Sequence, residues 1–174
     1  MPSEVPTRLA RRPAETAEQP ASAVSDLAGW LDRMTAQLFN AAPDRISRAD
    51  ITVLSRTTVD DLPHIQALWP AFEHLVGLRG RKMYASVDTA AGTYTTCTPV
   101  RDGDDPDALG LDISVLPGGD YLRGRLVGEP PAVYEQIGPG MAELERRADR
   151  DPSRPLVEFY RRRDQVELWV PVLP

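Results

Sequence analysis

Two carboxylates and two aromatic side chains stand close together near the carboxyl end of the chain. Residues 155–172 read PLVEFYRRRDQVELWVPV and place Glu158, Tyr160, Glu167 and Trp169 among aliphatic residues. A carboxylate that is partly removed from water has a raised pKa and can act as a general base on a water molecule, while aromatic rings can hold a flat ligand. These residue types therefore indicate either general-base catalysis or the binding of an aromatic compound.

The period of a β-strand predicts which of these side chains share a face. Side chains alternate along a strand, so Glu158 and Tyr160 point to the same side. The last strand is aliphatic at every second position, as a helix-covered face requires, which leaves Glu167 and Trp169 on its other side. If the two strands pair with matched faces, all four side chains look away from the helices and line a groove, where alternation also places Tyr121. In the alternative reading, Trp169 is an aromatic cap packed on the sheet.

Three further aromatic residues are candidate ligand contacts. Tyr94 lies in a predicted strand, Tyr134 lies near the start of a predicted helix, and Trp69 lies on the apolar stripe of another helix. Trp69 has a core-packing alternative, because a stripe at helical spacing is commonly buried. Glu158 has one too, as an exposed strand residue paired with an arginine of the turn 161–163.

The elements that must position these residues follow one order twice: strand, helix, strand, strand. A β-branched stretch predicts strand 51–59, and the next helix begins at Pro63 and ends before Gly77. Pro99 and Pro171, 72 positions apart, close the two units in the same way. The other expected elements are strands 82–88, 93–100, 111–116, 121–126, 156–160 and 165–172 and a helix over 131–150 that is broken or irregular near 138–140. The sequence thus predicts an α+β fold, duplicated about a pseudo-twofold axis, with a central ligand groove.

Residues 50–174 resemble the GyrI-like small-molecule-binding domains, which also serve as effector-binding domains of multidrug-sensing transcription regulators. The resemblance rests on a Pro-Gly-Gly-Asp-Tyr strand start at 117–121, an aromatic-containing second helix near Pro131, the Pro-x-x-Glu-x-Tyr strand of residues 155–160, and a terminal x-Pro-Val strand. It implies two strand-helix-strand-strand (SHS2) modules, at about 50–103 and 108–174.

In that family, the glutamate matching Glu158 sits in an aromatic-lined groove and contacts bulky, often cationic, aromatic ligands. The resemblance further implies that a stand-alone member can be a hydrolase that opens the cyclopropane ring of DNA-alkylating natural products. Glu158 would then be the general base, with Tyr160 and Tyr121 beside it, and Trp169, Glu167 and the three further aromatic residues would contact the ligand. No cofactor is expected. In this sequence, the basic turn 161–163 replaces the Asn-Asp type of turn that is common in the family.

The amino-terminal region differs in composition. Residues 1–22 are rich in Pro, Ala, Glu and Arg with few large apolar side chains, and they are expected to form a flexible tail. In segment 23–49, apolar residues recur at helical spacing from Ser25 to Asn40 and predict an amphipathic helix, which would dock on the body or on a second copy in a homodimer. One helix is too little for a helix-turn-helix module, so no direct nucleic-acid binding is expected.

Charge and composition narrow the function classes. The net charge of -6 does not favour general attraction to nucleic acid or anionic membranes, and no long apolar run predicts a membrane span, so a cytoplasmic location is expected. His64 and His74 have no ligand partners at metal-binding spacing, and no metal site is expected. The single Cys97 cannot form an internal disulfide, and no glycine-rich stretch matches a phosphate loop.

Three functions fit the sequence. The first is binding of a bulky aromatic genotoxic compound followed by its hydrolytic detoxification. The second is binding or sequestration of such a compound without chemistry. The third is an interaction protein of the gyrase-inhibitor type, which acts through a protein partner.

Overall fold

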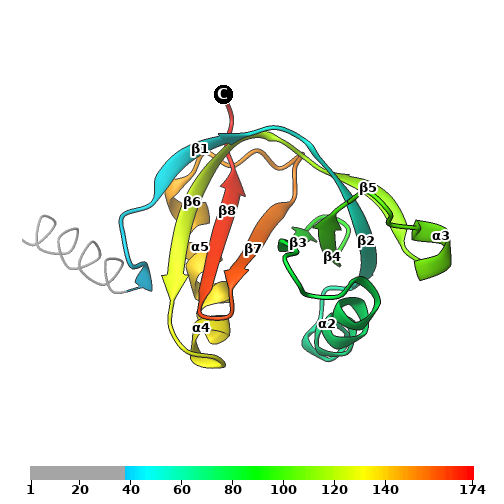
Figure 1. Ribbon diagram of the computed structural model, residues 1–174. Coiled ribbons are helices and arrows are strands. Elements are labelled where there is room, and N and C mark those ends of the chain that lie inside the picture. The colour runs from blue at the N-terminus through cyan, green and yellow to red at the C-terminus, as the bar shows by residue number, and fades with distance from the viewer. Residues whose placement is uncertain (1–37) are drawn as a thin grey trace, which may run out of the picture.

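The computed structural model describes residues 38–174, which form an α+β fold with one large sheet and few helices (Figure 1). The predicted tail 1–22 and most of the predicted helix from Ser25 to Asn40 lie outside the described residues. In chain order the elements are β1 (Asp44–Arg48), β2 (Ile51–Val59), α2 (Leu62–Val76), β3 (Met83–Asp88), β4 (Thr93–Pro99), α3 (Pro106–Leu109), β5 (Asp112–Leu116), β6 (Gly119–Val127), α4 (Ala132–Glu135), α5 (Ile137–Arg147), β7 (Leu156–Arg162) and β8 (Gln165–Pro171).

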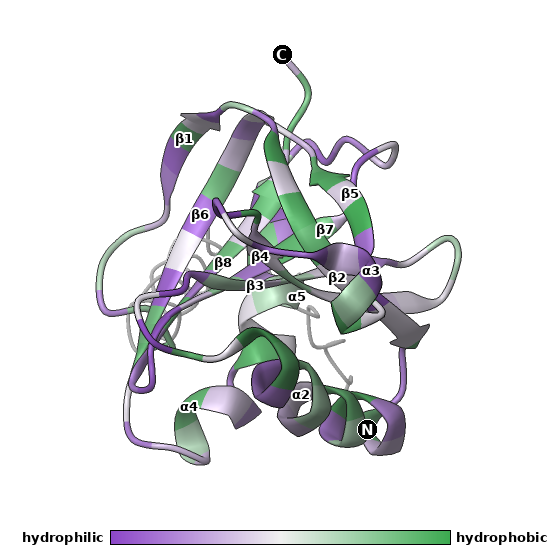
Figure 2. Ribbon diagram, turned by 45° about the vertical axis from the view of Figure 1, so that its right-hand side comes forward, coloured by the Kyte–Doolittle hydropathy of each residue, from purple (hydrophilic) through white to green (hydrophobic). Residues whose placement is uncertain are grey.

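The sheet is antiparallel throughout and has the strand order β1-β6-β8-β7-β3-β4-β2-β5. It curls into a half-barrel, as the arched strands of Figure 1 show. β3 and β7 pair at its centre, with Ala85 opposite Glu158. Hydrophilic and hydrophobic residues alternate in bands along β6 (Figure 2), as expected for a strand with two different faces.

Both longer helices cover the same face of the sheet. α5 packs on β6 and β8, where Leu144 meets Leu126 and Leu168 in one buried cluster. α2 packs on the other half of the sheet, where Phe72 meets Leu54. The opposite face carries its own buried cluster under the curl of β1 and β5, made of Val53, Tyr84, Cys97, Leu116, Tyr121, Val157 and Trp169. Both faces of the sheet therefore have a core, which burial of apolar area stabilises.

Helix α2 confirms the prediction made from its sequence signals. The Asp61 side chain caps the helix by accepting a hydrogen bond from the backbone N–H of His64 at 2.9 Å, and a proline occupies the first turn. Gly77 ends the helix with a positive φ of 70°, which a residue with a side chain rarely adopts. The predicted stripe supplies the buried residues Leu68, Phe72 and Val76.

Three local expectations differ from the structure. Asp44–Arg48, predicted to lie in the amino-terminal helical segment, forms edge strand β1 and pairs with β6. The helix expected over 131–150 is two helices, α4 and α5, and the break lies at Gln136 instead of near 138–140. The acidic loop contains the short helix α3, capped by the Asp105 side chain, which accepts a hydrogen bond from the backbone of Ala108 at 3.1 Å.

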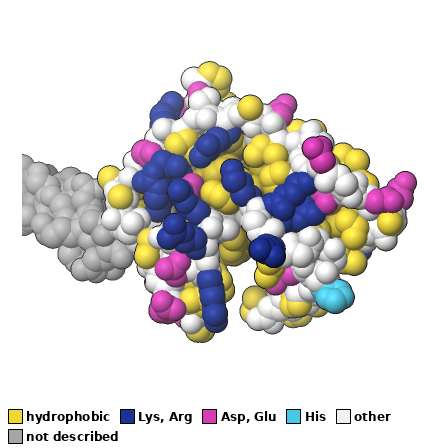
Figure 3. All heavy atoms as spheres, in the orientation of Figure 1, with side chains coloured by type: hydrophobic (Ala, Val, Ile, Leu, Met, Phe, Trp, Pro, Cys, Tyr) yellow, Lys and Arg dark blue, Asp and Glu magenta, His cyan; other side chains and the backbone are white. Residues whose placement is uncertain are grey.

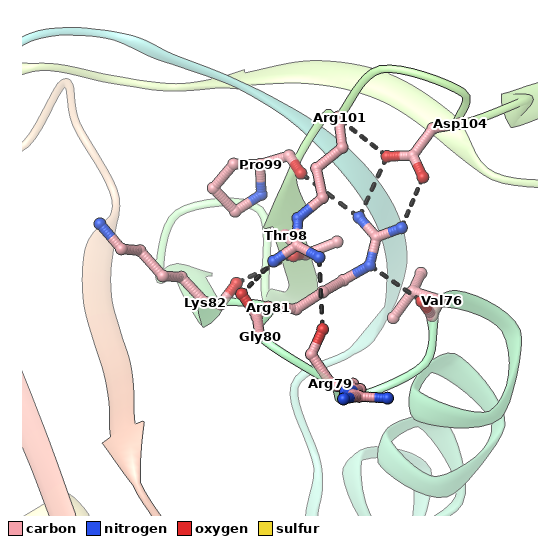
Figure 4. A network of polar contacts seen from close by, with 9 residues as sticks. All are labelled: Val76, Arg79, Gly80, Arg81, Lys82, Thr98, Pro99, Arg101 and Asp104. Atoms are coloured by element: carbon pink, nitrogen blue, oxygen red, sulfur yellow. Dashed lines mark hydrogen bonds and ion pairs between the residues drawn. The ribbon is translucent and has the colours of Figure 1, made fainter.

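Arg81 ties the end of α2 to the loop that follows β4 (Figure 4). Its guanidinium donates to the Val76 carbonyl at 2.8 Å and to both carboxylate oxygens of Asp104, at 3.0 and 2.5 Å. The side chains of Arg81 and Asp104 are only 9% and 8% exposed. The Arg81 hydrogen bond, helped by the backbone N–H of Arg101, lowers the pKa of Asp104.

We expect Asp104→Asn to lower the free energy of unfolding by about 1–3 kcal/mol, because it removes the charge-assisted pair with Arg81. Denaturant unfolding at pH 7 measures the loss. Since the folded-state pKa of Asp104 is depressed, its contribution is present above the unfolded value of 3.8 and is lost as the pH falls through the lower folded value. Asp102→Asn in the same exposed loop is the control and should have little effect; equal losses in both variants would contradict the assignment.

Candidate functional site

A cleft of about 1390 Å³ opens between α2 and the α4–α5 pair on the helix-covered face of the sheet. Figure 3 shows the surface hollowed between the two lobes that carry these helices. The floor comes from β3, β4 and β7, one wall from α2, and the other wall from α4 and the first turn of α5. The main lining residues are Asp60, Asp61, Ile65, Trp69, Glu73, Met83, Tyr94, Tyr134, Glu135, Ile137, Glu158 and Tyr160.

Glu158 lies at the floor of this cleft and is 6% exposed. Strand pairing sets its direction, because it stands opposite Leu168 of β8, which packs in the cluster beneath α5. Its Oε2 accepts hydrogen bonds from the hydroxyls of Tyr94 at 2.8 Å and Tyr160 at 2.7 Å. These tyrosines come from strands on either side of the sheet's centre, so the carboxylate joins the two halves of the sheet.

The second carboxylate oxygen of Glu158 faces the cleft. Among residues 38–174, no side chain or backbone group donates to Oε1, and this oxygen is not among the fully buried atoms that lack a partner. Because the residue lines the cleft, Oε1 is the acceptor that a bound molecule or a water would meet.

Burial raises the pKa of Glu158, and the negative charge of Asp60 raises it further, while the two tyrosine hydrogen bonds lower it. Burial also raises the pKa of Tyr94 and of Tyr160, and the neighbouring Glu158 adds to both effects. Both phenols therefore stay protonated at neutral pH and act as donors to the carboxylate.

Trp69 and Tyr134 complete the aromatic wall. The indole Nε1 of Trp69 donates to the Tyr94 hydroxyl at 3.2 Å, and its ring meets that of Tyr160 edge to face at 4.7 Å between centroids. Tyr134 stands at the rim, where it is 39% exposed and donates to the Arg163 carbonyl at 3.1 Å. Its ring lies 6.1 Å from that of Tyr160. A flat or bulky aromatic molecule could thus contact rings from both walls.

The ionised groups around the cleft are mostly acidic once ion pairs are counted. Arg81 is paired with Asp104, and Arg161 reaches Glu167 at 3.3 Å on the opposite face of the sheet. Four further carboxylates line the cleft: Asp60, Asp61, Glu73 and Glu135. Arg162 and Arg163 lie in the turn at its edge. The cleft therefore suits a neutral or cationic ligand better than an anion.

The structure separates the predicted site residues into two groups. Glu158, Tyr160, Tyr94, Tyr134 and Trp69 line the cleft together. The other three, Trp169, Glu167 and Tyr121, lie on the opposite face of the sheet. The predicted groove on the face away from the helices is thus not where the cleft is.

Strand register explains this correction. Val157 pairs with Trp169 and Phe159 with Glu167, so Trp169 and Glu167 share a face with the neighbours of Glu158 and not with Glu158 itself. A shift of one residue in register exchanges the faces of a whole strand. Glu158 therefore points toward the helix side, where the gap between α2 and α5 leaves it reachable.

On the opposite face, Trp169, Glu167 and Tyr121 have structural partners. The indole of Trp169 donates to Glu167 at 3.2 Å, and Arg123 lies 3.5 Å from the same carboxylate. Tyr121 is fully buried, its ring centroid is 5.8 Å from that of Trp169, and its hydroxyl donates to the Pro117 carbonyl at 2.5 Å. The alternative reading of Trp169 as a packed aromatic thus agrees with the structure.

Sequence reasoning missed several cleft residues, chiefly Ile65 and Glu73 of α2 and Ile137 of α5. One signal could have found the first two: Ile65, Trp69 and Glu73 are four residues apart and must share one side of the helix. That side borders the buried stripe, so it faces the cleft rather than bulk solvent. Ile137 has no comparable signal, because its position depends on the break between α4 and α5.

Comparison with known proteins identifies the fold but no family. No protein-family model matches the chain, and no curated protein does either. An integron cassette protein from the mobile metagenome of Vibrio cholerae is 17% identical, with a TM-score of 0.61 over 75% of this chain and 95% of that one. The protein SAV2435, solved bound to tetraphenylphosphonium, is 18% identical, with a TM-score of 0.56 over 76% and 94%. A putative transcription regulation protein from Staphylococcus aureus MU50 is 14% identical, with a TM-score of 0.52 over 76% and 99%. The chain thus has a half-barrel fold in which a small-molecule complex is known.

Two features are absent from the described part of the chain. Within residues 38–174, no group of three or more His, Cys, Asp or Glu side chains is arranged to hold a metal ion. In the same residues, no helix combines the length and apolar character needed to cross a membrane.

We expect Glu158→Gln to increase thermal stability at neutral pH, because it removes a buried charge and keeps an oxygen that can accept from both tyrosines. The folded-state pKa of Glu158 is raised, so the wild type is relatively more stable below the unfolded value of 4.5 and loses this advantage as the pH rises through the folded value. Melting curves of both proteins between acid and neutral pH measure the difference. A gap that does not widen with pH would contradict the raised pKa.

Proposed function

We propose that this protein binds a bulky aromatic small molecule, neutral or cationic, in the cleft between α2 and the α4–α5 pair. One observation carries the proposal: Glu158 is held by two tyrosine hydroxyls at the floor of an aromatic-walled cleft, with one carboxylate oxygen open to it. A carboxylate among aromatic rings suits a hydrophobic cation, because the rings supply contact area and π-faces and the carboxylate supplies the opposite charge.

The fold supports the same proposal. A protein of similar fold was solved with tetraphenylphosphonium, a bulky aromatic cation. The sequence resemblance to GyrI-like domains, with a groove glutamate at the position of Glu158, points the same way. We include in the proposal a duplicated SHS2 origin, which the element orders β2-α2-β3-β4 and β6-α4-α5-β7-β8 support. The crossed pairing of β1 with β6 and of β5 with β2 supports it as well.

Isothermal titration with tetraphenylphosphonium tests the binding proposal. We expect saturable binding by the wild type and an affinity loss of about tenfold or more in Glu158→Gln, because the variant lacks the charge that faces the cation. Glu129→Gln, an exposed change outside the cleft lining, should bind as the wild type does. Absence of binding to this and other bulky aromatic compounds would favour the interaction-protein alternative.

A second candidate function is hydrolysis of a strained ring, and the raised pKa and open Oε1 of Glu158 favour it. In this proposal, Glu158 takes a proton from a water molecule whose oxygen bonds to a cyclopropane carbon. The ring C–C bond breaks, its electron pair moves to the conjugated carbonyl oxygen, and that oxygen finally receives the proton. Tyr160 and Tyr94 hold the carboxylate in place for this transfer. Such a reaction would detoxify a DNA-alkylating compound.

Incubation with cyclopropane-bearing DNA alkylators, followed by mass spectrometry, tests the hydrolysis proposal. A hydrolase adds one water, about 18 Da, to the compound, and the product should be absent with Glu158→Gln, which has no base. Recovery of unchanged compound that co-purifies with the wild type would leave a binding or sequestering protein and contradict the chemistry.

A further inference from the structure

The hydrogen bonds above Glu158 have a direction, and Trp69 sets it. An indole N–H can only donate, so the Tyr94 hydroxyl must accept from Trp69 across their 3.2 Å contact. Tyr94 then has one hydrogen to give, either to Glu158 Oε2 at 2.8 Å or to the Tyr160 hydroxyl at 3.3 Å. The bond to the carboxylate is shorter and is charge-assisted, so it is the stronger of the two.

The second tyrosine, Tyr160, donates to the same carboxylate as Tyr94 does. Tyr160 donates to the same Oε2 at 2.7 Å, so two donors converge on one oxygen. Hydrogen bonds donated to a carboxylate stabilise its ionised form relative to its protonated form, and the bond that Tyr94 accepts from Trp69 strengthens Tyr94 as a donor. The order Trp69 to Tyr94 to Glu158 therefore favours an ionised carboxylate, with Oε2 occupied and Oε1 as the oxygen left for a ligand.

We propose that Trp69 is a positioning residue: its N–H fixes the direction of this hydrogen-bond chain, so that the floor of the cleft presents an acceptor and not a donor. The inference rests on the proposed function and narrows its ligand class. The matching ligand is an aromatic compound with a protonated amine, which brings both a positive charge and an N–H donor to Glu158 Oε1. An aromatic compound that carries only acceptors or a negative charge is excluded.

The charged residues around this hydrogen-bond chain agree with a cationic ligand. Asp60, Asp61 and Glu73 line the cleft on the side of α2, and Glu135 lines it on the side of α4. The Trp69 ring also packs against Tyr160, so its N–H and its ring have separable roles, one in polarity and one in packing. A test must therefore remove the N–H without removing the ring.

Replacement of Trp69 by benzothienylalanine meets this need, because a sulfur atom takes the place of the N–H in a ring of nearly the same shape. Three probes separate the contributions: proflavine carries a positive charge and N–H donors, tetraphenylphosphonium carries only the charge, and anthraquinone sulfonate carries only acceptors and a negative charge. The wild type should bind proflavine best and the sulfonate worst. In the substituted protein, we expect the ratio of proflavine affinity to sulfonate affinity to fall about tenfold, because the variant lacks the hydrogen bond from Trp69 to Tyr94 that orders the chain.

The control is the same replacement at Trp169, whose N–H binds Glu167 on the opposite face of the sheet; the affinity ratio should not change. Tyr94→Phe breaks the same chain one step later and should lower the ratio to a similar extent. If both cleft variants keep the wild-type ratio, or if the wild type binds proflavine and the sulfonate equally well, this inference is wrong while the proposed binding stands. If the wild type binds none of the three probes, the proposed function fails with it.

Discussion

The central pairing of β3 with β7 is the constraint on which the site depends. It joins the two halves of the sheet and sets Glu158 of β7 opposite Ala85 of β3. Tyr94 stands one strand further, on β4, and must reach across β3 to donate to the carboxylate. The small, fully buried Ala85 leaves room for that reach. A larger residue there would stand between donor and acceptor, so the polar network requires both the pairing and the small side chain.

A buried carboxylate is costly, and the fold stabilises the two on the neighbouring strands β7 and β8 in different ways. Glu167 is surrounded by the Trp169 indole and by the guanidinium groups of Arg161 and Arg123, which compensate its charge within the protein. Glu158 receives hydrogen bonds only from neutral phenols, and its charge is left without a basic partner among the described residues. The arrangement around Glu167 is structural, whereas Glu158 can still gain stability by binding a cation or a proton. The carboxylate without a basic partner thus lines the cleft, and the compensated one lies in the packed core.

Local signals predicted the elements well where the chain itself sets them. Asp61, Pro63 and Gly77 define α2 through capping, a fixed φ and a left-handed turn, which act within a few residues. The break between α4 and α5 lies at Gln136, close to the irregularity that Gly138 and Gly140 predicted, whereas strand β1 was not predicted. β1 is a short, polar strand that pairs, among residues 38–174, with β6 alone, more than seventy positions along the chain. Its conformation therefore depends on a contact that no local pattern contains. The pairing of β7 with β8 also places Glu158 on the helix-covered face and not on the predicted groove face.

The sequence by itself determined that Glu158 and Tyr160 share one face of β7, because alternation along a strand is a property of the backbone. It also determined which carboxylate and aromatic side chains are available for chemistry. Only the tertiary structure decided which face that is, since the register of β7 against β8 assigns Trp169 and Glu167 to the other side. It likewise brought Trp69 and Tyr94 to the carboxylate. These contacts join residues far apart in the chain, and packing of the whole sheet and both helices selects them.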